Sequence, residues 1–444
     1  MKLWQKDKTS LQEVEKFTIG RDQEMDMFLA PFDVLGSLAH ITMLQSIGLI
    51  EKAELDVLQS ALKKIYQRIV SGEFRVEPGV EDIHSQVEME LTKELGDVGK
   101  KIHSGRSRND QVLVDLKLYL RHEIEQVVLE VNSLFNLLLG QSEKFKDNLL
   151  PGYTHFQLAM PSSFGLWFGA YAESLVDDII TLHAAYRVVN KNPLGSAAGY
   201  GSSFPLNRTM TTRLLGFEDL NYNVVYAQMG RGKTERIVAS ALANIASTLA
   251  KLSMDACIFL NQHFAFISFP DELTTGSSIM PHKKNPDVFE LVRGRCNQLM
   301  ALPNDIAMIT ANLPSGYHRE MQLLKETLFP AIQSLKDCLR MVHLMVSNIS
   351  VRQDILQDEK YKYIFSVEEV NRLVLQGVPF RDAYRQVGSD IENGKYSPER
   401  NVVHSHEGSI GNLNLPEIRA MMEKHLGEFK FADCQDAIRK LLDE

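Results

Sequence analysis

The chain has 444 residues, of which 44% are hydrophobic and 24% are charged, so it can bury several packed layers or domains. This composition excludes an intrinsically disordered protein. The formal net charge of -9 argues against a nucleic-acid-binding domain, whose surface is normally basic, although a local cluster of cations can still bind an anionic small molecule.

The cysteines and the N-terminus indicate a soluble protein of the reducing cytoplasm. The four cysteines are spread along the chain without a C-x-x-C pair, at Cys257, Cys296, Cys338 and Cys434. This spacing excludes a zinc knuckle and a redox motif. The N-terminal residues mix charges into every turn and lack the apolar core of a signal peptide. The longest uncharged run, Ala256 to Pro270, is too short to cross a bilayer as a helix.

Long stretches without Gly or Pro, with apolar residues at helical spacing, predict long helices. The first runs from Asp110 to Leu139, and the second, Ser163 to Asn192, is interrupted only by two glycines. A third spans Lys233 to Phe269. The fourth, Ala331 to Gln376, has a polar patch near Gln353 to Glu359 that predicts a break between helices.

Helices of this length exceed the average globular helix and need partners along their whole length, which indicates a helical bundle. A structural coiled coil is the alternative, but the sequence has no sustained seven-residue repeat. We predict a mainly α fold in three parts: a mixed helical N-terminal domain over residues 1–106, a central bundle of long helices over residues 107–354 and a small C-terminal helical domain over residues 355–444. The loops between the long helices are rich in Gly, Ser, Pro, His and Asn, and we expect the functional residues there.

The first of these loops, KKIHSGRSRNDQ, lies directly before the first long helix and is rich in cations. It gathers Arg106 and Arg108 with Ser107 and Asn109. Arginine side chains and the free N–H groups at the start of a helix both suit carboxylates. A helix cap beside a basic surface patch is the alternative, and this loop alone leaves both open.

The second loop, PGYTHFQLAMPSS, places Thr154, His155 and Gln157 just before the next long helix. Histidine is the side chain best suited to proton transfer near neutral pH. A lone histidine in such a loop is, however, more often a hydrogen-bonded structural residue.

The third loop, TTGSSIMPHKKNPD, follows a flexible glycine and two hydroxyls with the cluster His282, Lys283, Lys284 and Asn285. Removing a proton from a carbon next to a carboxylate develops negative charge on the carboxylate oxygens, which fixed cations and amide donors stabilise. A serine hydroxyl is a weak base unless a neighbouring lysine stabilises its alkoxide. A solvated basic turn is the alternative.

The fourth segment, NLPSGYHREMQLLKE, places Tyr317, Gln322 and Lys325 where a turn gives way to a helix. Gln322 and Lys325 are three residues apart on one face, so amide, phenol and ammonium can converge on one ligand, although alone the segment fits an ordinary helix surface. The short segment EDIH offers too few ligands for a metal site, so we expect no metal and no cofactor.

The segment GSSIMPHKKNP closely resembles the signature of the fumarase/aspartase superfamily. HSGRSRNDQ, YTHFQLAMPSS and EDIH occur in the order and approximate spacing of its argininosuccinate lyase branch, and LPSGYHREMQLLKE is similar to a further signature of that branch. The resemblance weakens after about Glu326. It implies a cofactor-free carbon–nitrogen lyase that splits argininosuccinate into L-arginine and fumarate in the last step of arginine biosynthesis. It also implies three mostly helical domains and a homotetramer whose active sites combine different subunits.

By motif position, the resemblance implies that Ser277 is the base that takes the Cβ proton of the succinyl group, and that Lys283 and Asn285 hold the resulting negative charge. It implies that His155 contributes to proton transfer at the leaving guanidinium nitrogen, with Glu290 pairing with and orienting it. The remaining matched positions imply substrate contacts, at the carboxylates from Ser107, Arg108, Asn109 and Thr154 and at the arginine end from Tyr317, Gln322 and Lys325.

The sequence departs from the superfamily pattern in two segments. GSAAGYGSSFPLNR replaces the usual Gly- and Ala-rich segment, and MGRGKTER replaces an expected Arg-Asp pair, which leaves the role of Arg231 open. The adenylosuccinate lyase branch is an alternative that does not explain HSGRSRNDQ. A catalytically silent structural relative of the delta-crystallin kind is another, and the presence of all five implied catalytic residues argues against it.

Overall fold

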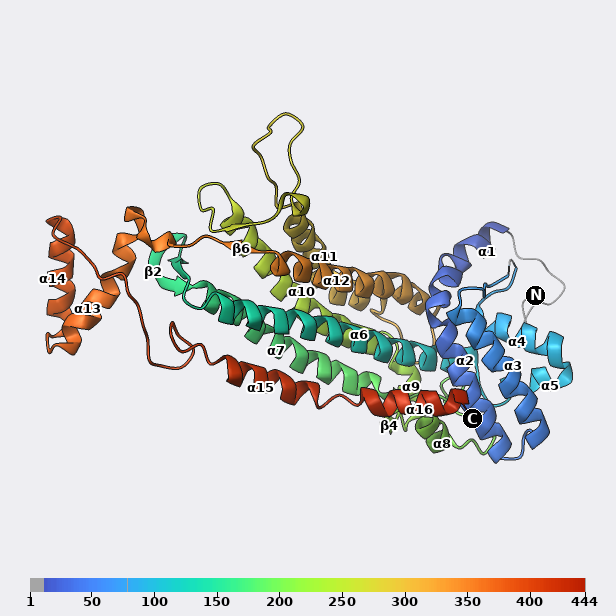
Figure 1. Cartoon of the computed structure of the whole chain (residues 1–444). Coiled ribbons are helices and arrows are strands. Elements are labelled where there is room, and N and C mark those ends of the chain that lie inside the picture. The colour runs from blue at the N-terminus through green and yellow to red at the C-terminus, as the bar shows by residue number, and fades with distance from the viewer. Residues whose placement is uncertain (1–11, 78, 444) are drawn as a thin grey trace.

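In the computed structural model, which describes residues 12–77 and 79–443, long helices run side by side along an elongated molecule (Figure 1). The helices are α1 (Gln12–Ile19), α2 (Asp22–Ser46), α3 (Lys52–Val70), α4 (Ile83–Leu95), α5 (Asp97–Lys100), α6 (Arg108–Lys144), α7 (Phe164–Val189), α8 (Arg208–Leu214), α9 (Val224–Met229), α10 (Lys233–Leu260), α11 (Asp287–Ile309), α12 (Leu323–Ser347), α13 (Ser366–Leu375), α14 (Phe380–Glu392), α15 (Leu415–Leu426) and α16 (Phe431–Asp443). The strands are β1 (Leu149–Thr154), β2 (Gln157–Ser163), β3 (Lys191–Asn192), β4 (Asp219–Leu220), β5 (Ile267–Ser268) and β6 (Ser350–Val351).

The central bundle consists of α6, α7, α10, α11 and α12, which pack against one another along their apolar faces. The predictions of long helices from Asp110 and from Ser163 are confirmed by α6 and α7. Ser163 fixes the start of α7, because its hydroxyl accepts a hydrogen bond from the Leu166 N–H at 3.1 Å. The mainly helical fold class is likewise confirmed.

The third long helix is shorter than its sequence predicts, because α10 ends at Leu260 rather than near Phe269. The Asn261 side chain accepts hydrogen bonds from the N–H groups of His263 and Phe264, and Ala265 has a left-handed φ of 46°. This turn directs Phe266 into the core, where it is fully buried. A side-chain hydrogen bond to the backbone therefore ends the helix without Gly or Pro.

The predicted break within the fourth stretch, near Gln353 to Glu359, is confirmed. α12 ends at Ser347, and α13 begins only at Ser366. Between them β6 pairs with β5 in antiparallel register. The other strand pairs are an antiparallel hairpin of β1 and β2 and a short parallel pair of β3 and β4.

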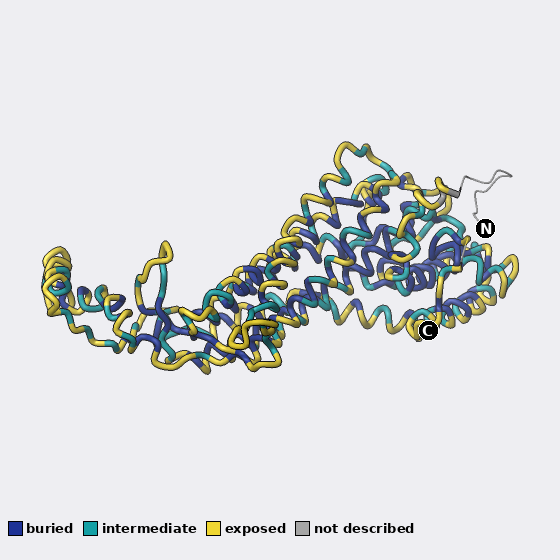
Figure 2. Tube along the Cα trace, turned by 90° about the horizontal axis from the view of Figure 1, so that it is seen from above, coloured by how far each residue is buried: buried dark blue, intermediate teal, exposed yellow. Residues whose placement is uncertain are grey.

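The C-terminal residues 355–443 lie in three places rather than together. α13 and α14 share a small apolar cluster at one end of the molecule, and α14 is largely exposed (Figure 2). α15 packs along α7, and α16 returns to the N-terminal helices, where Leu441 joins their apolar core. The division at residues 106 and 354 therefore stays a proposal, and the expectation for the N-terminal segment falls partly on residues outside the described part of the chain.

α2 and α10 are long and apolar enough to cross a membrane by length and composition alone. Within the structure, however, 72% of the apolar window of α2 and 56% of that of α10 are buried. Core helices of soluble proteins have the same property, because they bury apolar side chains against protein.

Candidate active site

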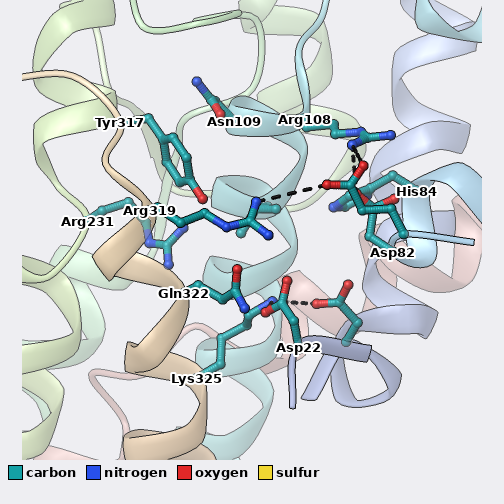
Figure 3. A pocket seen from close by; sticks show the side chains of 13 residues that line it. Asp22, Asp82, His84, Arg108, Asn109, Arg231, Tyr317, Arg319, Gln322 and Lys325 are labelled. Atoms are coloured by element: carbon teal, nitrogen blue, oxygen red, sulfur yellow. Dashed lines mark hydrogen bonds and ion pairs between the residues drawn. The ribbon is translucent and has the colours of Figure 1, made fainter. Parts of the chain in front are cut away.

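A polar pocket lies where the N-terminal helices meet the bundle (Figure 3). Its walls come from the start of α2, the segment before α4, the start of α6 and the turn before α12. The lining residues are Asp22, Asp26, Glu81, Asp82, His84, Arg108, Asn109, Val112, Arg231, Tyr317, Arg319, Gln322 and Lys325. Five of the residues that the sequence predicts as substrate contacts therefore meet here, although they come from distant segments: Arg108, Asn109, Tyr317, Gln322 and Lys325.

The start of α6 is fixed by a capping box, which aims its first residues at the pocket. The Ser107 hydroxyl accepts a hydrogen bond from the Asn109 N–H at 3.3 Å, and the Asp110 carboxylate accepts one from the Ser107 N–H at 2.7 Å. Ser107 is thus engaged as the helix cap, while Arg108 and Asn109 line the pocket.

Arg108 is held by acids on the segment before α4. Its guanidinium donates to Glu81 at 2.8 Å and to the Ser85 hydroxyl at 2.7 Å, and it lies 3.3 Å from an Asp82 oxygen. Burial alone lowers the pKa of Arg108, but Asp82 and Glu81 outweigh burial and raise it above its usual value. The guanidinium is therefore both charged and fixed in direction.

Lys325 is buried at the base of the pocket between two carboxylates of α2. Its Nζ lies 2.5 Å from Asp22 Oδ1 and 2.5 Å from Asp26 Oδ1. Burial lowers the pKa of Lys325, but Asp26 and Asp22 raise it above its usual value, so the ammonium stays charged. Gln322, in the short helix η3 (Arg319–Gln322), donates its amide hydrogens to the carbonyls of Ile19 at 2.8 Å and Thr18 at 3.2 Å.

Arg231, whose role the sequence leaves open, holds the turn that carries Gln322. It is buried, its Nε donates to Glu235 at 3.0 Å, and its Nη2 donates to the Met321 carbonyl at 2.8 Å. Glu235 also accepts from the Gly232 N–H at 2.7 Å. In place of the expected Arg-Asp pair, Arg231 and Glu235 therefore form a buried ion pair, and Arg231 also positions η3.

Behind the pocket, the described residues contain a buried cluster of Asp33, His84 and Asp115 whose ligand-type atoms lie within 4.8 Å of one another. His84 Nδ1 donates to Asp33 Oδ1 at 2.7 Å and lies 3.7 Å from Asp115 Oδ2. Burial alone lowers the pKa of His84, but Asp33 and Asp115 raise it to about 10. The His84 imidazolium and the nearby Arg106 guanidinium thus supply positive charge beside Asp33, while burial and Asp33 raise the pKa of Asp115 well above its usual value, so the cluster fits an internal ion pair rather than a metal site.

The predicted proton-transfer loop stands apart from the pocket, in the segment that projects from the bundle before α11 (Figure 1). The Ser277 hydroxyl accepts hydrogen bonds from the N–H groups of Ile279 at 3.3 Å and Met280 at 3.2 Å. The backbone N–H of Asn285 donates to the Thr275 carbonyl at 2.8 Å, which closes the loop. Lys283 is exposed, and so is Glu290 in the first turn of α11.

The predicted histidine lies at the tip of the β1–β2 hairpin, and β2 and α4 lie toward opposite ends of the molecule (Figure 1). His155 and Phe156 form the two-residue turn with left-handed φ values of 54° and 58°, as the tight hairpin turn requires. Thr154 and His155 are exposed. Among the described residues, His155 and Glu290 do not pair with each other. Within one chain the predicted site residues therefore lie in three regions: the pocket, the tip of the β1–β2 hairpin, and the projecting loop with the start of α11.

Sequence reasoning missed the acidic wall of this pocket, namely Asp22 and Asp26, as well as Arg319. Asp22 and Asp26 are four residues apart on one face of α2, so both side chains reach the same cation. The four-residue spacing of the two acids was visible in the sequence, but their use follows only from the structure, where Lys325 is buried and needs acidic partners.

Comparisons with known proteins agree with this architecture. A family model described as Lyase matches residues 5–301. A solved structure of an EDDS lyase variant with bound fumarate aligns with a TM-score of 0.78 at 20% identity, covering 98% of this chain and 95% of that chain. A class II fumarase from Schistosoma mansoni aligns with a TM-score of 0.70 at 17% identity, covering 93% of this chain and 91% of that chain. The family match defines a lyase, and the likeness to these solved structures shows that the fold is shared.

The sequence relation is more specific than the fold. The argininosuccinate lyase of Parabacteroides distasonis is 63% identical over 441 residues, which cover 99% of this chain and 99% of that protein. The chain therefore belongs to the argininosuccinate lyase family of carbon–nitrogen lyases, as its sequence motifs predict.

Proposed function

We propose that this chain catalyses the reversible β-elimination of argininosuccinate to L-arginine and fumarate, the last step of arginine biosynthesis. The observation that carries this proposal is the pocket in which the SGRSRNDQ and GYHREMQLLK segments meet, within a chain that belongs to the argininosuccinate lyase family. The pocket holds guanidinium, ammonium, amide and phenol donors for the carboxylates of such a substrate.

The direct test supplies argininosuccinate to the purified protein and follows fumarate by its ultraviolet absorbance and arginine by amino-acid analysis. We expect equal amounts of both products. Adenylosuccinate serves as the contrasting substrate and should yield no AMP. Absence of fumarate from argininosuccinate would contradict the proposal and favour a silent structural relative.

For the chemistry we propose that Ser277 removes the Cβ proton, and that Lys283 and Asn285 stabilise the charge on the adjacent carboxylate. The electron pair of the broken C–H bond forms the double bond of fumarate, and the Cα–N bond breaks. His155, oriented by Glu290, contributes to proton transfer at the departing guanidinium nitrogen. The composition of the loop supports these roles, because Lys283 and Asn285 lie close to Ser277 in the sequence.

Substitution of Ser277 tests the choice of base. We expect Ser277→Ala to lower kcat about 100-fold or more while leaving the assembly intact, because removing a base raises the barrier without disturbing packing. Activity is measured by fumarate release and assembly by light scattering. Wild-type activity in Ser277→Ala would make the choice of base wrong, and Ser278 would be tested next.

We further propose that the chain forms a homotetramer in which each active site draws residues from different subunits. Two observations support this: the predicted site residues lie in three separate regions of one chain, and the bundle helices expose large apolar side chains. These side chains are Leu129, Met254, Leu291, Met300, Met308, Met341 and Leu344. A solution mass of one chain would contradict the proposal.

We propose that the enzyme works in the cytoplasm on a small molecule, without nucleic acid, membrane or metal. The buried Asp33, His84 and Asp115 cluster supports the absence of a metal, because the His84 imidazolium already pairs with Asp33 there. Activity is expected to survive dialysis against a strong chelator. Loss of activity that Mg²⁺ or Zn²⁺ restores would contradict this part of the proposal.

A further inference from the structure

A second polar cavity, of about 260 Å³, lies between the start of α10 and the loop that follows α11 (the α10 cavity). It is separate from the pocket of Figure 3, although Arg231 and Met321 line both. Its lining includes the cations Arg231, Lys233 and Arg236, and none of the described residues that line it is an acid. The walls of the α10 cavity therefore carry positive charge only.

Gly232 brings these cations together at the first turn of α10. Its φ of 76° is left-handed, and a Cβ at this position would lie 2.5 Å from a side-chain carbon of Thr310. The start of α10 therefore packs directly against the end of α11, with no room for a larger residue. Lys233 and Arg236 follow in the first turn, three residues apart on one face, and both are exposed.

This arrangement of charge is unfavourable without an anion. The N-terminus of a helix carries partial positive charge, which repels cations in the first turn, and like charges three residues apart repel each other. The acid of this turn, Glu235, already accepts from Arg231 Nε at 3.0 Å and from the Gly232 N–H at 2.7 Å. Among the described residues, neither Lys233 nor Arg236 forms an ion pair. Two positive charges are thus left without a partner.

Arg231 supplies the fixed part of the α10 cavity, because its residue is only 5% exposed. Its Nε and Nη2 atoms are held by Glu235 and by the Met321 carbonyl. Among the described residues, its Nη1 atom donates no hydrogen bond. A buried guanidinium nitrogen without an acceptor has lost hydration that the oxygen of a ligand can replace.

We propose that the α10 cavity binds a doubly charged oxyanion, either inorganic phosphate or a free dicarboxylate. Arg231 offers a guanidinium that is fixed in direction, and the exposed Lys233 and Arg236 approach the anion from the solvent side. The two unpartnered cations match its two negative charges. Because Arg231 also donates to the Met321 carbonyl, the bound anion contacts the residue that positions η3.

The test measures binding of radiolabelled phosphate to the wild type by equilibrium dialysis, with sodium chloride holding the ionic strength constant. A saturating equilibrium mixture of argininosuccinate, arginine and fumarate keeps the active site occupied. We expect phosphate to bind in this mixture with a Kd on the order of 1 mM. If the mixture displaces all of the bound phosphate, the anion lies in the active site and the proposal is overturned.

Paired variants locate the site. Lys233→Gln/Arg236→Gln removes both unpartnered cations and should weaken phosphate binding by about tenfold or more, because charge-assisted hydrogen bonds are lost. Arg187→Gln/Lys251→Gln is the matched control: it removes one arginine and one lysine that are exposed elsewhere on the bundle, and it should bind phosphate like the wild type. Equal phosphate affinity in the two double variants would overturn the proposal. Thermal unfolding without phosphate checks that both variants are folded.

Competition identifies the source of the anion. Unlabelled succinate that displaces phosphate in the same mixture assigns the α10 cavity to dicarboxylates as well, whereas succinate without effect assigns it to phosphate. The outcome for the α10 cavity is also independent of the lyase reaction. A wild type that releases no fumarate but binds phosphate through Lys233 and Arg236 overturns the proposed function and leaves the anion site standing.

Discussion

Asp110 joins the first turn of α6 to the glycine-rich segment at residues 195–201, and replacing it tests how the pocket is held. One oxygen of its fully buried carboxylate accepts from the Ser107 N–H at 2.7 Å. The other accepts from the N–H groups of Gly195 at 3.0 Å and Ala197 at 2.9 Å. The carboxylate therefore links the start of α6, which includes Arg108, to a loop that contains several positive φ values.

In Asp110→Asn, one carboxylate oxygen becomes an NH₂ group that faces a backbone N–H. At least one hydrogen bond to a charged acceptor is lost, worth about 1.5–3 kcal/mol, and the facing N–H is left without an acceptor. Burial raises the pKa of Asp110 to about 6 despite its three N–H donors, so the neutral amide recovers part of the desolvation cost. We therefore expect a net loss of about 2–3 kcal/mol in stability.

The assay compares thermal unfolding and reaction kinetics of the wild type with Asp110→Asn and with Asp147→Asn, an exposed control. Asp110→Asn should unfold several degrees lower, and its KM for argininosuccinate should rise because Arg108 and Asn109 lose their support. Asp147→Asn should behave as the wild type. If Asp110→Asn has the Tm and KM of the control, the three hydrogen bonds do not hold the pocket together.

Two further substitutions test the supports of the pocket. Arg231→Gln removes the hydrogen bond to the Met321 carbonyl and leaves Glu235 buried without its cation, so KM should rise more than kcat falls; an unchanged KM would contradict a positioning role. His84 has a folded pKa of about 10 against a usual 6.5, so its contribution to stability is complete below pH 6.5 and is lost as pH rises through about 10. The Tm advantage of the wild type over His84→Gln should therefore shrink across that window, and a pH-independent difference would refute the imidazolium beside Asp33.

The sequence was sufficient for the body of α6, α7 and α10, because a stretch of thirty or so residues with little or no Gly and Pro leaves few other structures. It did not predict α2 or α11, which contain Pro31 and Pro303, and it placed the start of α12 at Ala331 although that helix begins at Leu323. It was insufficient for the end of α10. Asn261 ends that helix through hydrogen bonds from His263 and Phe264, and this choice depends on burial of Phe266 in a core that the sequence does not display. The scattered packing of residues 355–443 depends on tertiary contacts in the same way.

For the pocket, motif positions predicted residues that are more than two hundred positions apart in the chain, Arg108 and Lys325 among them, and they line one cavity. Asp22 and Asp26 were missed because acids in the first turns of a helix are ordinary there. Only the contact with Lys325 reveals their use. The separation of Ser277 and His155 from this cavity could not be predicted from motifs, which carry no distance information.

The most direct test of the account mixes two inactive variants. Arg108→Ala disables the pocket, and Ser277→Ala disables the projecting loop. If each site takes these two segments from different chains, random co-assembly of equal amounts restores about one quarter of the wild-type sites, because each segment is intact with a chance of about one half. The account predicts that activity. Mixed assemblies as inactive as either parent would contradict it, because each complete site would then lie within one chain.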